Sequence, residues 1–180
     1  MNKKIVAIIA IACIIIVGGL VGYKVSTNNT VMKLTNNFEA RLQVTEAFHD
    51  KMWKTLKEKT AITDKSVKAF QDIYIPLMEG RYSQGGKLMQ WVKEQNPNFD
   101  QSLFKDLMVS VESLRTGFFK EQQLLIAIVE QYKNIRDMIP SSMFCPSTDR
   151  TRKMDAFEPI TSSRSKDVMK RGMDDETYIK

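Results

Sequence analysis

An apolar run from Ile5 to Gly22 limits the possible structures of this chain more than any other feature of its 180 residues. The run contains no charged side chain and lies between Lys3-Lys4 and Tyr23-Lys24. Its 18 residues would span roughly 27 Å as a helix, close to the roughly 30 Å of a bilayer's hydrocarbon core. We therefore expect residues 1–4 to form a basic N-terminal end and residues 5–23 to form a transmembrane helix. The protein is then a single-pass membrane protein that contacts the lipid bilayer through this run.

Two kinds of processed N-terminal segment share some of these features. A cleaved signal peptide has an apolar stretch of about 7 to 15 residues before a small-residue site, which Val17-Gly18-Gly19 resembles. A lipoprotein would be processed before Cys13, after Ala10-Ile11-Ala12. Cys13 is followed by three isoleucines, however, where a mature lipoprotein begins with small or polar residues. The length of the run favours retention over both alternatives.

The orientation of the predicted span depends on the lysines around it. Lys3 and Lys4 precede the run, whereas Lys24 and the more distant Lys33 follow it. The positive-inside rule favours a cytoplasmic N-terminus by a small margin. The side of the membrane that carries the rest of the chain therefore stays open.

Beyond the run, the sequence predicts helices. The chain has 8 Gly and 5 Pro, too few for an all-β fold with a turn about every 8 to 12 residues. From residue 28 to residue 59, apolar residues recur mostly at four-residue steps and so share one helix face. They are Leu34, Phe38, Leu42, Phe48, Met52 and Leu56. This helix either has a cap at residues 28–30 or continues directly from the apolar run.

A second helix is expected to begin at Thr63-Asp64, whose side-chain oxygens can accept hydrogen bonds from unpaired backbone amides. Pro76 lacks an amide proton, so the sequence predicts a kink or break between residues 72 and 75. Gly80 and Gly85-Gly86 weaken the following turns. We expect this helix to be bent or split before it ends at residues 96–98.

The strongest periodicity lies in a third helix, expected from Asp100 to Ile139 with Asn98 or Asp100 as its cap. Its seam alternates steps of three and four residues, which is typical of helices packed nearly parallel to a partner. The seam residues are Phe104, Leu107, Val111, Leu114, Phe118, Glu121, Leu125, Ile128, Tyr132 and Ile135. Further apolar residues beside the seam favour a bundle core over a two-stranded coiled coil.

Together these patterns predict an all-α fold. An N-terminal transmembrane helix precedes an antiparallel bundle of three to four long helices over residues 28–144. Residues 145–180 show no sustained apolar period and are expected to form a mostly disordered tail, from which Met154 and Phe157 are candidates to dock on the bundle. Cys13 and Cys145 are too far apart in this arrangement to form a disulfide.

No catalytic, cofactor-binding or metal-binding residue is predicted. His49 is the single histidine and lies near Glu46 and Asp50, without the paired Glu-x-x-His motifs of a helical metal site. Residues 80–86 lack the spacing of a phosphate-binding loop, and Cys145 has no nearby histidine to activate it. The net charge of +6 is spread over mixed-sign helices, so no nucleic-acid partner is expected. No small-molecule substrate is identified either.

The end of the third predicted helix resembles a known family. Val129, Tyr132, Ile135 and Arg136, followed by Ile139-Pro140-Ser141-Ser142, are similar to the closing signature of the LemA family, in which a Tyr-Asn helix ends in Phe-Pro-Ser-Asn. Glu46-Ala47-Phe48 is similar to that family's Glu-Ala-Trp. The resemblance covers roughly residues 34–144 and implies a divergent LemA member: a membrane-anchored antiparallel helical bundle without catalytic residues.

The chain departs from that family at two places. Residues 57–63 replace the family's Arg-Arg-x-Asp-Leu-Ile-Pro segment and contain no proline. Lys133 stands where the second Tyr-Asn pair has its Asn, and Leu125-Ile126 replaces the first pair.

The sequence therefore predicts a non-enzymatic, single-pass membrane-anchored helical scaffold or protein-interaction module. It would bind other proteins or a second copy of itself through helical surfaces. The alternative is a membrane sensor or receptor whose helical bundle binds a ligand, although such receptors usually have a second span, and no other run approaches 18 apolar residues. An enzyme of unknown type and an aromatic-basic nucleic-acid binder are the remaining, weaker alternatives.

Overall fold

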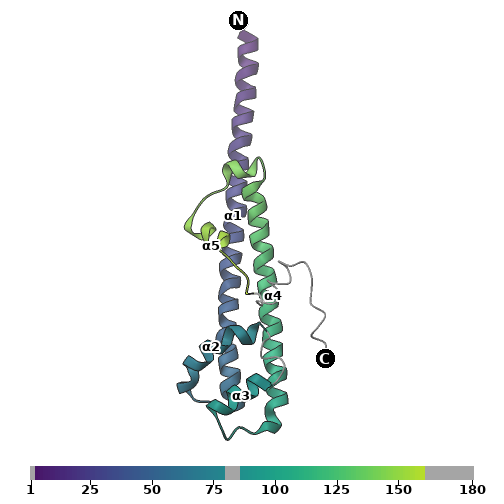
Figure 1. Ribbon diagram of the computed structural model, residues 1–180. Coiled ribbons are helices and arrows are strands. Elements are labelled where there is room, and N and C mark those ends of the chain that lie inside the picture. Colours follow the sequence, from purple (N-terminus) through teal and green to yellow (C-terminus); the bar gives the residue numbers. More distant parts are fainter. Residues whose placement is uncertain (1–2, 80–85, 161–180) are drawn as a thin grey trace, which may run out of the picture. The chain divides into compact units, whose positions relative to one another are not determined.

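Helix α1 (Lys3–Thr60) is one uninterrupted helix that contains both the apolar run and the first helix predicted after it. The computed structural model describes residues 3–79 and 86–160 of the chain. Over these ranges the fold is all-α, as the sequence predicted, and Figure 1 shows the helices in chain order. The others are α2 (Val67–Met78), α3 (Gly86–Gln95), α4 (Phe104–Asp137) and α5 (Asp149–Asp155). Short 3-10 helices η1 (Asp64–Ser66), η2 (Gln101–Leu103) and η3 (Ser141–Phe144) lie between them.

The first bundle helix has no separate start, but its end is well defined. No cap interrupts α1 at residues 28–30, so the continuous alternative is confirmed. The helix ends at Thr60 because Ala61 takes a left-handed conformation, with φ of 51°. The side chain of Asn96 then donates a hydrogen bond of 2.8 Å to the backbone oxygen of Thr60, which satisfies one carbonyl of the last turn.

The predicted second helix is split into α2 and α3. Thr63 does precede the first turn, but its side chain accepts no capping hydrogen bond, so that part of the prediction was wrong. Of the kink or break predicted at residues 72–75, the break is not found, because α2 continues through Pro76 to Met78. Pro76 lies in the last turn of α2, where its missing amide removes one helical hydrogen bond, and the amide of Glu79 still donates to the oxygen of Ile75 at 2.9 Å. Gly80 and Gly85 lie outside the described residues.

The third predicted helix is confirmed as α4. Asp100, one of the two predicted caps, caps the 3-10 helix η2 that leads into α4: its Oδ1 accepts a hydrogen bond from the amide of Ser102 at 2.9 Å. This bond favours the ionised carboxylate and lowers the pKa of Asp100. Most predicted seam residues of α4 lie in a core: Leu107, Val111, Phe118, Leu125 and Tyr132 are buried, and Phe104, Leu114, Ile128 and Ile135 are partly buried against it. Gln122 and Val129 are buried as well, beside the less buried seam residues Glu121 and Ile128.

The described residues divide into two compact units, and α1 and α4 contribute residues to both. Among the described residues, unit 1 comprises 3–42 and 124–157, and unit 2 comprises 43–79, 86–123 and 158–160. Each unit has its own apolar core, and no residue belongs to both cores. Each is therefore described by itself.

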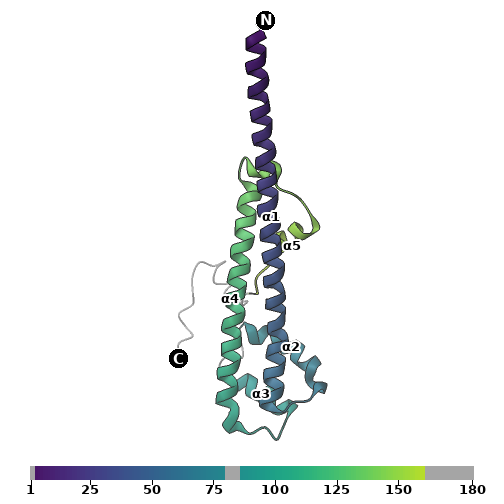
Figure 2. The ribbon, with the colours of Figure 1, turned by 180° about the vertical axis from the view of Figure 1, so that it is seen from behind.

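In unit 1, α1 and α4 run antiparallel and side by side, with α5 beside them, as the opposite views of Figures 1 and 2 show. The core of this unit consists of Val31, Leu34, Phe38, Leu125, Val129, Tyr132 and Met154. Phe157 adds an edge-to-face contact with Phe38, with ring centroids 5.5 Å apart.

The expected disordered tail must be corrected over its first part. Residues 149–155 form α5, and Met154 is completely buried in the core of unit 1. The docking predicted for Met154 and Phe157 is confirmed. A seven-residue helix shows little periodicity and is stabilised by the core that it joins, which explains why the sequence pattern did not reveal it. Residues 161–180 of the predicted tail lie outside the described residues.

In unit 2, α2 and α3 pack with the C-terminal part of α1 and the N-terminal part of α4. The core is rich in aromatic and sulfur-containing residues, including Met52, Phe70, Tyr74, Met78, Trp91 and Phe118. Gln122 is one of the buried polar residues of this unit, and its side-chain oxygen accepts a hydrogen bond of 2.9 Å from the amide of Ile160.

Candidate functional site

The N-terminal part of α1 exposes an apolar surface on all sides. Every described side chain from residue 4 to residue 26 is exposed, including Ile8, Ile14 and Ile15. Among the described helices, α1 alone is long and apolar enough to cross a membrane, and none of its most apolar window is buried inside the structure. A core helix of a water-soluble fold would be buried, whereas a signal sequence would share this exposure.

A pocket of about 620 Å³ lies on unit 2. Its lining residues come from α1, α2, α4 and the segment after α5: Gln43, Thr45, Glu46, Ala47, His49, Asp50, Tyr74, Phe118 and Ile160. The sequence placed His49 near Glu46 and Asp50, and all three line this pocket. The structure adds Tyr74, Phe118 and Ile160, which are distant in sequence and were not predicted to join them.

His49 and Tyr74 form the aromatic wall of the pocket. The two rings meet edge to face with centroids 4.7 Å apart, and the His49 ring lies 5.1 Å from that of Phe70. The Nδ1 atom of His49 lies 3.4 Å from Oδ1 of Asp50, while the imidazole keeps about a third of its surface exposed. Burial, with a smaller contribution from Asp50, raises the pKa of Tyr74 to about 12. The phenol of Tyr74 is therefore neutral at physiological pH.

This pocket suits binding better than acid–base chemistry. Its wall is aromatic and its carboxylates, Glu46 and Asp50, are exposed at the rim. A group with an apolar body and a positive charge would match both features. Within residues 3–79 and 86–160, no three His, Cys, Asp or Glu side chains gather closely enough to hold a metal ion.

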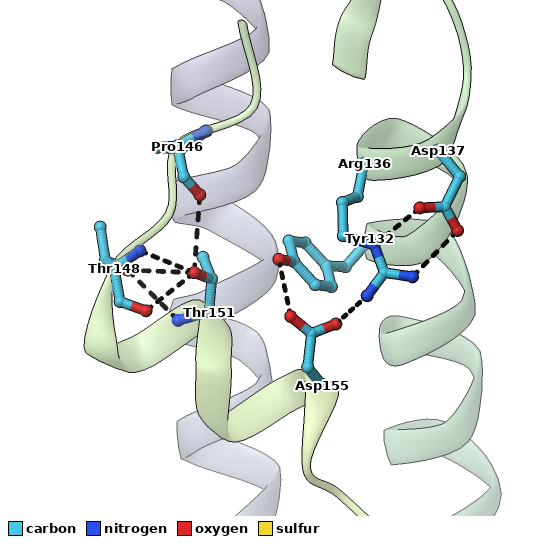
Figure 3. Close-up of polar contacts among 7 residues, drawn as sticks. All are labelled: Tyr132, Arg136, Asp137, Pro146, Thr148, Thr151 and Asp155. Carbon is cyan, nitrogen blue, oxygen red and sulfur yellow. Dashed lines mark hydrogen bonds and ion pairs between the residues drawn. The ribbon is translucent and has the colours of Figure 1, made fainter. Parts of the chain in front are cut away.

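The third site is a cluster of polar side chains that holds α5 against α4 in unit 1, as Figure 3 shows. The hydroxyl of Tyr132 donates to Oδ2 of Asp155 at 3.3 Å, and Arg136 forms an ion pair with the other oxygen of the same carboxylate. Arg136 also binds Asp137, with Nε 2.7 Å from Oδ1. Asp155 thus joins Tyr132, a residue of the predicted seam, to Arg136 on the same helix.

The start of α5 is fixed by a reciprocal pair of hydrogen bonds between Thr148 and Thr151. The amide of Thr151 donates to Oγ1 of Thr148 at 3.2 Å, and the amide of Thr148 donates to Oγ1 of Thr151 at 2.8 Å. This capping box occupies the position that Figure 3 shows beside Pro146. Its Thr-x-x-Thr spacing, next to Pro146, was the one local signal of α5 in the sequence.

Arg150 holds α5 against α1. Its guanidinium binds both oxygens of Glu39, at 2.9 Å from Nε and 2.6 Å from Nη2, and also Oδ1 of Asn36 at 2.7 Å. The hydrogen bond from Arg150 lowers the pKa of Glu39, although partial burial of that carboxyl acts in the opposite direction. A planar guanidinium that binds both carboxylate oxygens fixes orientation as well as distance.

The chain was compared with protein-family models, curated proteins and solved structures. No family model, curated protein or solved structure matches it.

Proposed function

We propose that this protein is a non-enzymatic helical scaffold or protein-interaction module, anchored in a membrane by residues 5–23 as a single span. The main support for this proposal is the continuity of α1. Its fully exposed apolar segment leads, without a cap or break, into the part of the helix that forms the core of unit 1. Thr27 is already buried, only five residues after Gly22. The resemblance to the LemA family supports the same proposal.

The composition of the segment accounts for its preference for lipid. Eleven of the residues from Ile5 to Gly22 are Ile, Val or Leu. Each contributes roughly −0.3 to −0.6 kcal/mol to insertion, so these side chains together contribute about −3 to −7 kcal/mol. In water the same side chains would stay exposed on every face of the helix, because the described fold supplies nothing to cover them.

The interaction role is supported by apolar side chains that α4 leaves exposed in unit 1. Leu124 and Ile126 lie on surfaces of α4 that are accessible to solvent. A long helix with such positions offers a second helix a surface for packing, whether the partner is another protein or a second copy.

The anchor is tested with the full chain carrying one epitope at each terminus. We expect both epitopes in a single species that stays in the membrane pellet after alkaline carbonate extraction. Protease treatment of intact cells then determines which side carries the bundle. A mature protein that begins within or after residues 13–23 would refute the retained anchor and favour a processed signal.

The interaction role is tested by photo-crosslinking in intact membranes. A crosslinker at Ile126 is expected to capture a defined partner or a second copy, whereas a crosslinker at the exposed, polar Asn37 serves as the matched control. Recovery of monomer alone from both positions, under all growth conditions, would contradict the scaffold.

The pocket on unit 2 favours a second candidate, a membrane sensor or receptor that binds a ligand in its helical domain. A ligand of this pocket would raise the thermal stability of the full chain in nanodiscs. It would have a weaker effect on Phe118→Ala, because that substitution removes part of the wall. If every stabilising compound acts equally on both forms, the pocket is not the binding site.

A further inference from the structure

The C-terminal end of α4 and the following η3 turn expose three large apolar side chains. We call Met138, Ile139, Pro140, Met143 and Phe144 the α4 corner. Ile139 is 85% exposed, Met143 76% and Met138 61%, and all belong to unit 1. Proteins rarely leave neighbouring apolar side chains so exposed unless another apolar surface covers them.

The α4 corner lies next to the end of the apolar segment. The ring of Phe144 packs edge to face on that of Tyr23, with centroids 5.9 Å apart. Tyr23 directly follows Gly22, the last residue of the apolar run, and Lys24 comes next. Both ribbon views show η3 beside α1 at this level (Figures 1 and 2). Aromatic and basic side chains in this position are typical of the headgroup region of a bilayer.

The backbone of the corner already has hydrogen-bond partners of its own. The oxygen of Met138 accepts from the amide of Ser142 at 2.7 Å and from the hydroxyl of Ser141 at 2.8 Å. The amide of Met143 donates to the oxygen of Pro140 at 3.2 Å, and Pro140 itself has no amide proton. These hydrogen bonds lower the cost of moving the turn out of water, because the groups that form them stay paired in a less polar environment.

We infer that the α4 corner inserts into the headgroup and upper acyl region of the bilayer, on the side where the span ends. Its occupant is thus the lipid surface, and the bundle contacts the membrane at two places: the span and the corner. This inference rests on the proposed membrane anchor. The corner's continuity with the apolar segment, through Tyr23 and Phe144, selects lipid over a protein partner. Two contacts would also restrict the tilt of unit 1 on the membrane.

The test measures the depth of single spin labels on the full chain in nanodiscs of phosphatidylcholine and phosphatidylglycerol. In a background with Cys13→Ala and Cys145→Ser, labels are placed at Ile139→Cys, Ile14→Cys and Ile126→Cys. Ile14 reports on the span. Ile126 is a matched control, because it is an exposed isoleucine of the same unit that lies within α4, roughly 17 Å before the end of that helix at Asp137. Met143→Cys provides a second corner position.

We expect collisions with oxygen, relative to those with a water-soluble nickel chelate, to be several-fold higher at Ile139 and Met143 than at Ile126. If the label at position 14 is deep in the bilayer but the corner labels are as exposed to the chelate as the label at position 126, the inference about the corner is overturned. The proposed anchor would then still stand. Exposure of the Ile14 label itself would refute the anchor. Corner labels shielded from both reagents, with broadening between labels, would show that a second copy covers the corner and would also overturn the inference.

Discussion

At the scale of single residues, the aromatic cluster of unit 2 combines close packing with one perturbed ionisation. Tyr74 is only 8% exposed and packs against His49, Phe70 and Phe118. Burial opposes formation of a phenolate there, and the negative charge of Asp50 opposes it further.

Tyr74 should therefore make stability fall at high pH. Its pKa is about 12 in the folded chain against 10.0 for the ordinary group, so the unfolded state ionises first. The stability contribution of the neutral phenol is complete below pH 10 and is lost between pH 10 and pH 12, by an amount on the order of 2 kcal/mol. Denaturant unfolding across this range, compared between the native chain and Tyr74→Phe, measures the effect. Equal pH dependence in the two chains would contradict it.

Gly117 shows where packing overrides helix propensity. A Cβ atom at this position of α4 would lie 2.9 Å from Cε1 of Phe48 and 3.0 Å from its Cζ. Alanine would improve the helix propensity by about 1 kcal/mol, but the overlap with a rigid ring costs roughly 1 to 3 kcal/mol. We expect Gly117→Ala to destabilise the native chain by about 1 kcal/mol in denaturant unfolding. In a Phe48→Leu background the same change should become neutral or stabilising, and an unchanged sign there would contradict the steric explanation.

At the scale of elements, α5 is a short helix whose stability comes from its contacts. Seven residues form too few internal hydrogen bonds to be stable alone, so α5 depends on buried Met154 and on the ion pairs of Arg150 and Asp155. Its release would expose part of the core of unit 1.

The docking of α5 should weaken in acid. Because Arg150 lowers the pKa of Glu39 below 4.5, the carboxylate's contribution is complete above that pH and is lost as pH falls through the folded-state pKa. Hydrogen exchange of the amides of residues 149–157 should therefore accelerate in the acid range, after correction for intrinsic exchange rates. Glu39→Gln should show faster exchange already at neutral pH and a weaker acid response. Asp149→Asn, whose carboxylate pairs with exposed Arg152 on the same helix, is the control.

The apolar segment of α1 yields a prediction about localisation. Replacing Ile11 and Ile15 by lysine changes the insertion free energy by roughly 3 to 4 kcal/mol at each position. Two such changes should therefore cancel the favourable contribution of about −3 to −7 kcal/mol from the eleven Ile, Val and Leu side chains of the native segment. We expect the double variant to appear in the soluble or aggregated fraction, whereas Ile11→Leu/Ile15→Leu remains in membranes. Carbonate extraction distinguishes them, and membrane retention of the lysine variant would contradict the span.

At the scale of the whole molecule, the described residues contain two apolar cores that share no residue. Val129 belongs to the core of unit 1 and Val111 to that of unit 2, and α4 contains both. Changes in the free energy of unfolding at positions without shared contacts usually add within about 0.5 kcal/mol.

We therefore expect Val129→Ala and Val111→Ala to cost roughly 1 to 3 kcal/mol each and to be additive in the double variant. Denaturant unfolding provides the free energies, and hydrogen exchange should show each single variant losing protection first in its own unit. A coupling free energy above about 1 kcal/mol would contradict the independence of the two cores.

The sequence by itself determined the elements whose cause is local and repetitive. Four-residue and alternating steps placed α1 and α4 correctly because helix periodicity acts within one segment, and Asp100 was identified as a cap for the same reason. The exposed apolar segment was equally evident, because its length and composition require no tertiary partner.

Only the tertiary structure decided which residues from distant segments meet. Met154 stabilises α5 from within the core of unit 1, and Tyr74 joins His49 to form the pocket. Gln122 is buried and accepts a hydrogen bond from the amide of Ile160. Ala61 takes a left-handed conformation that favours glycine, and Asn96 of another segment donates to the last carbonyl of α1 beside it. These features depend on pairs of residues far apart in the chain, and the periodicity of one segment contains no information about such pairs.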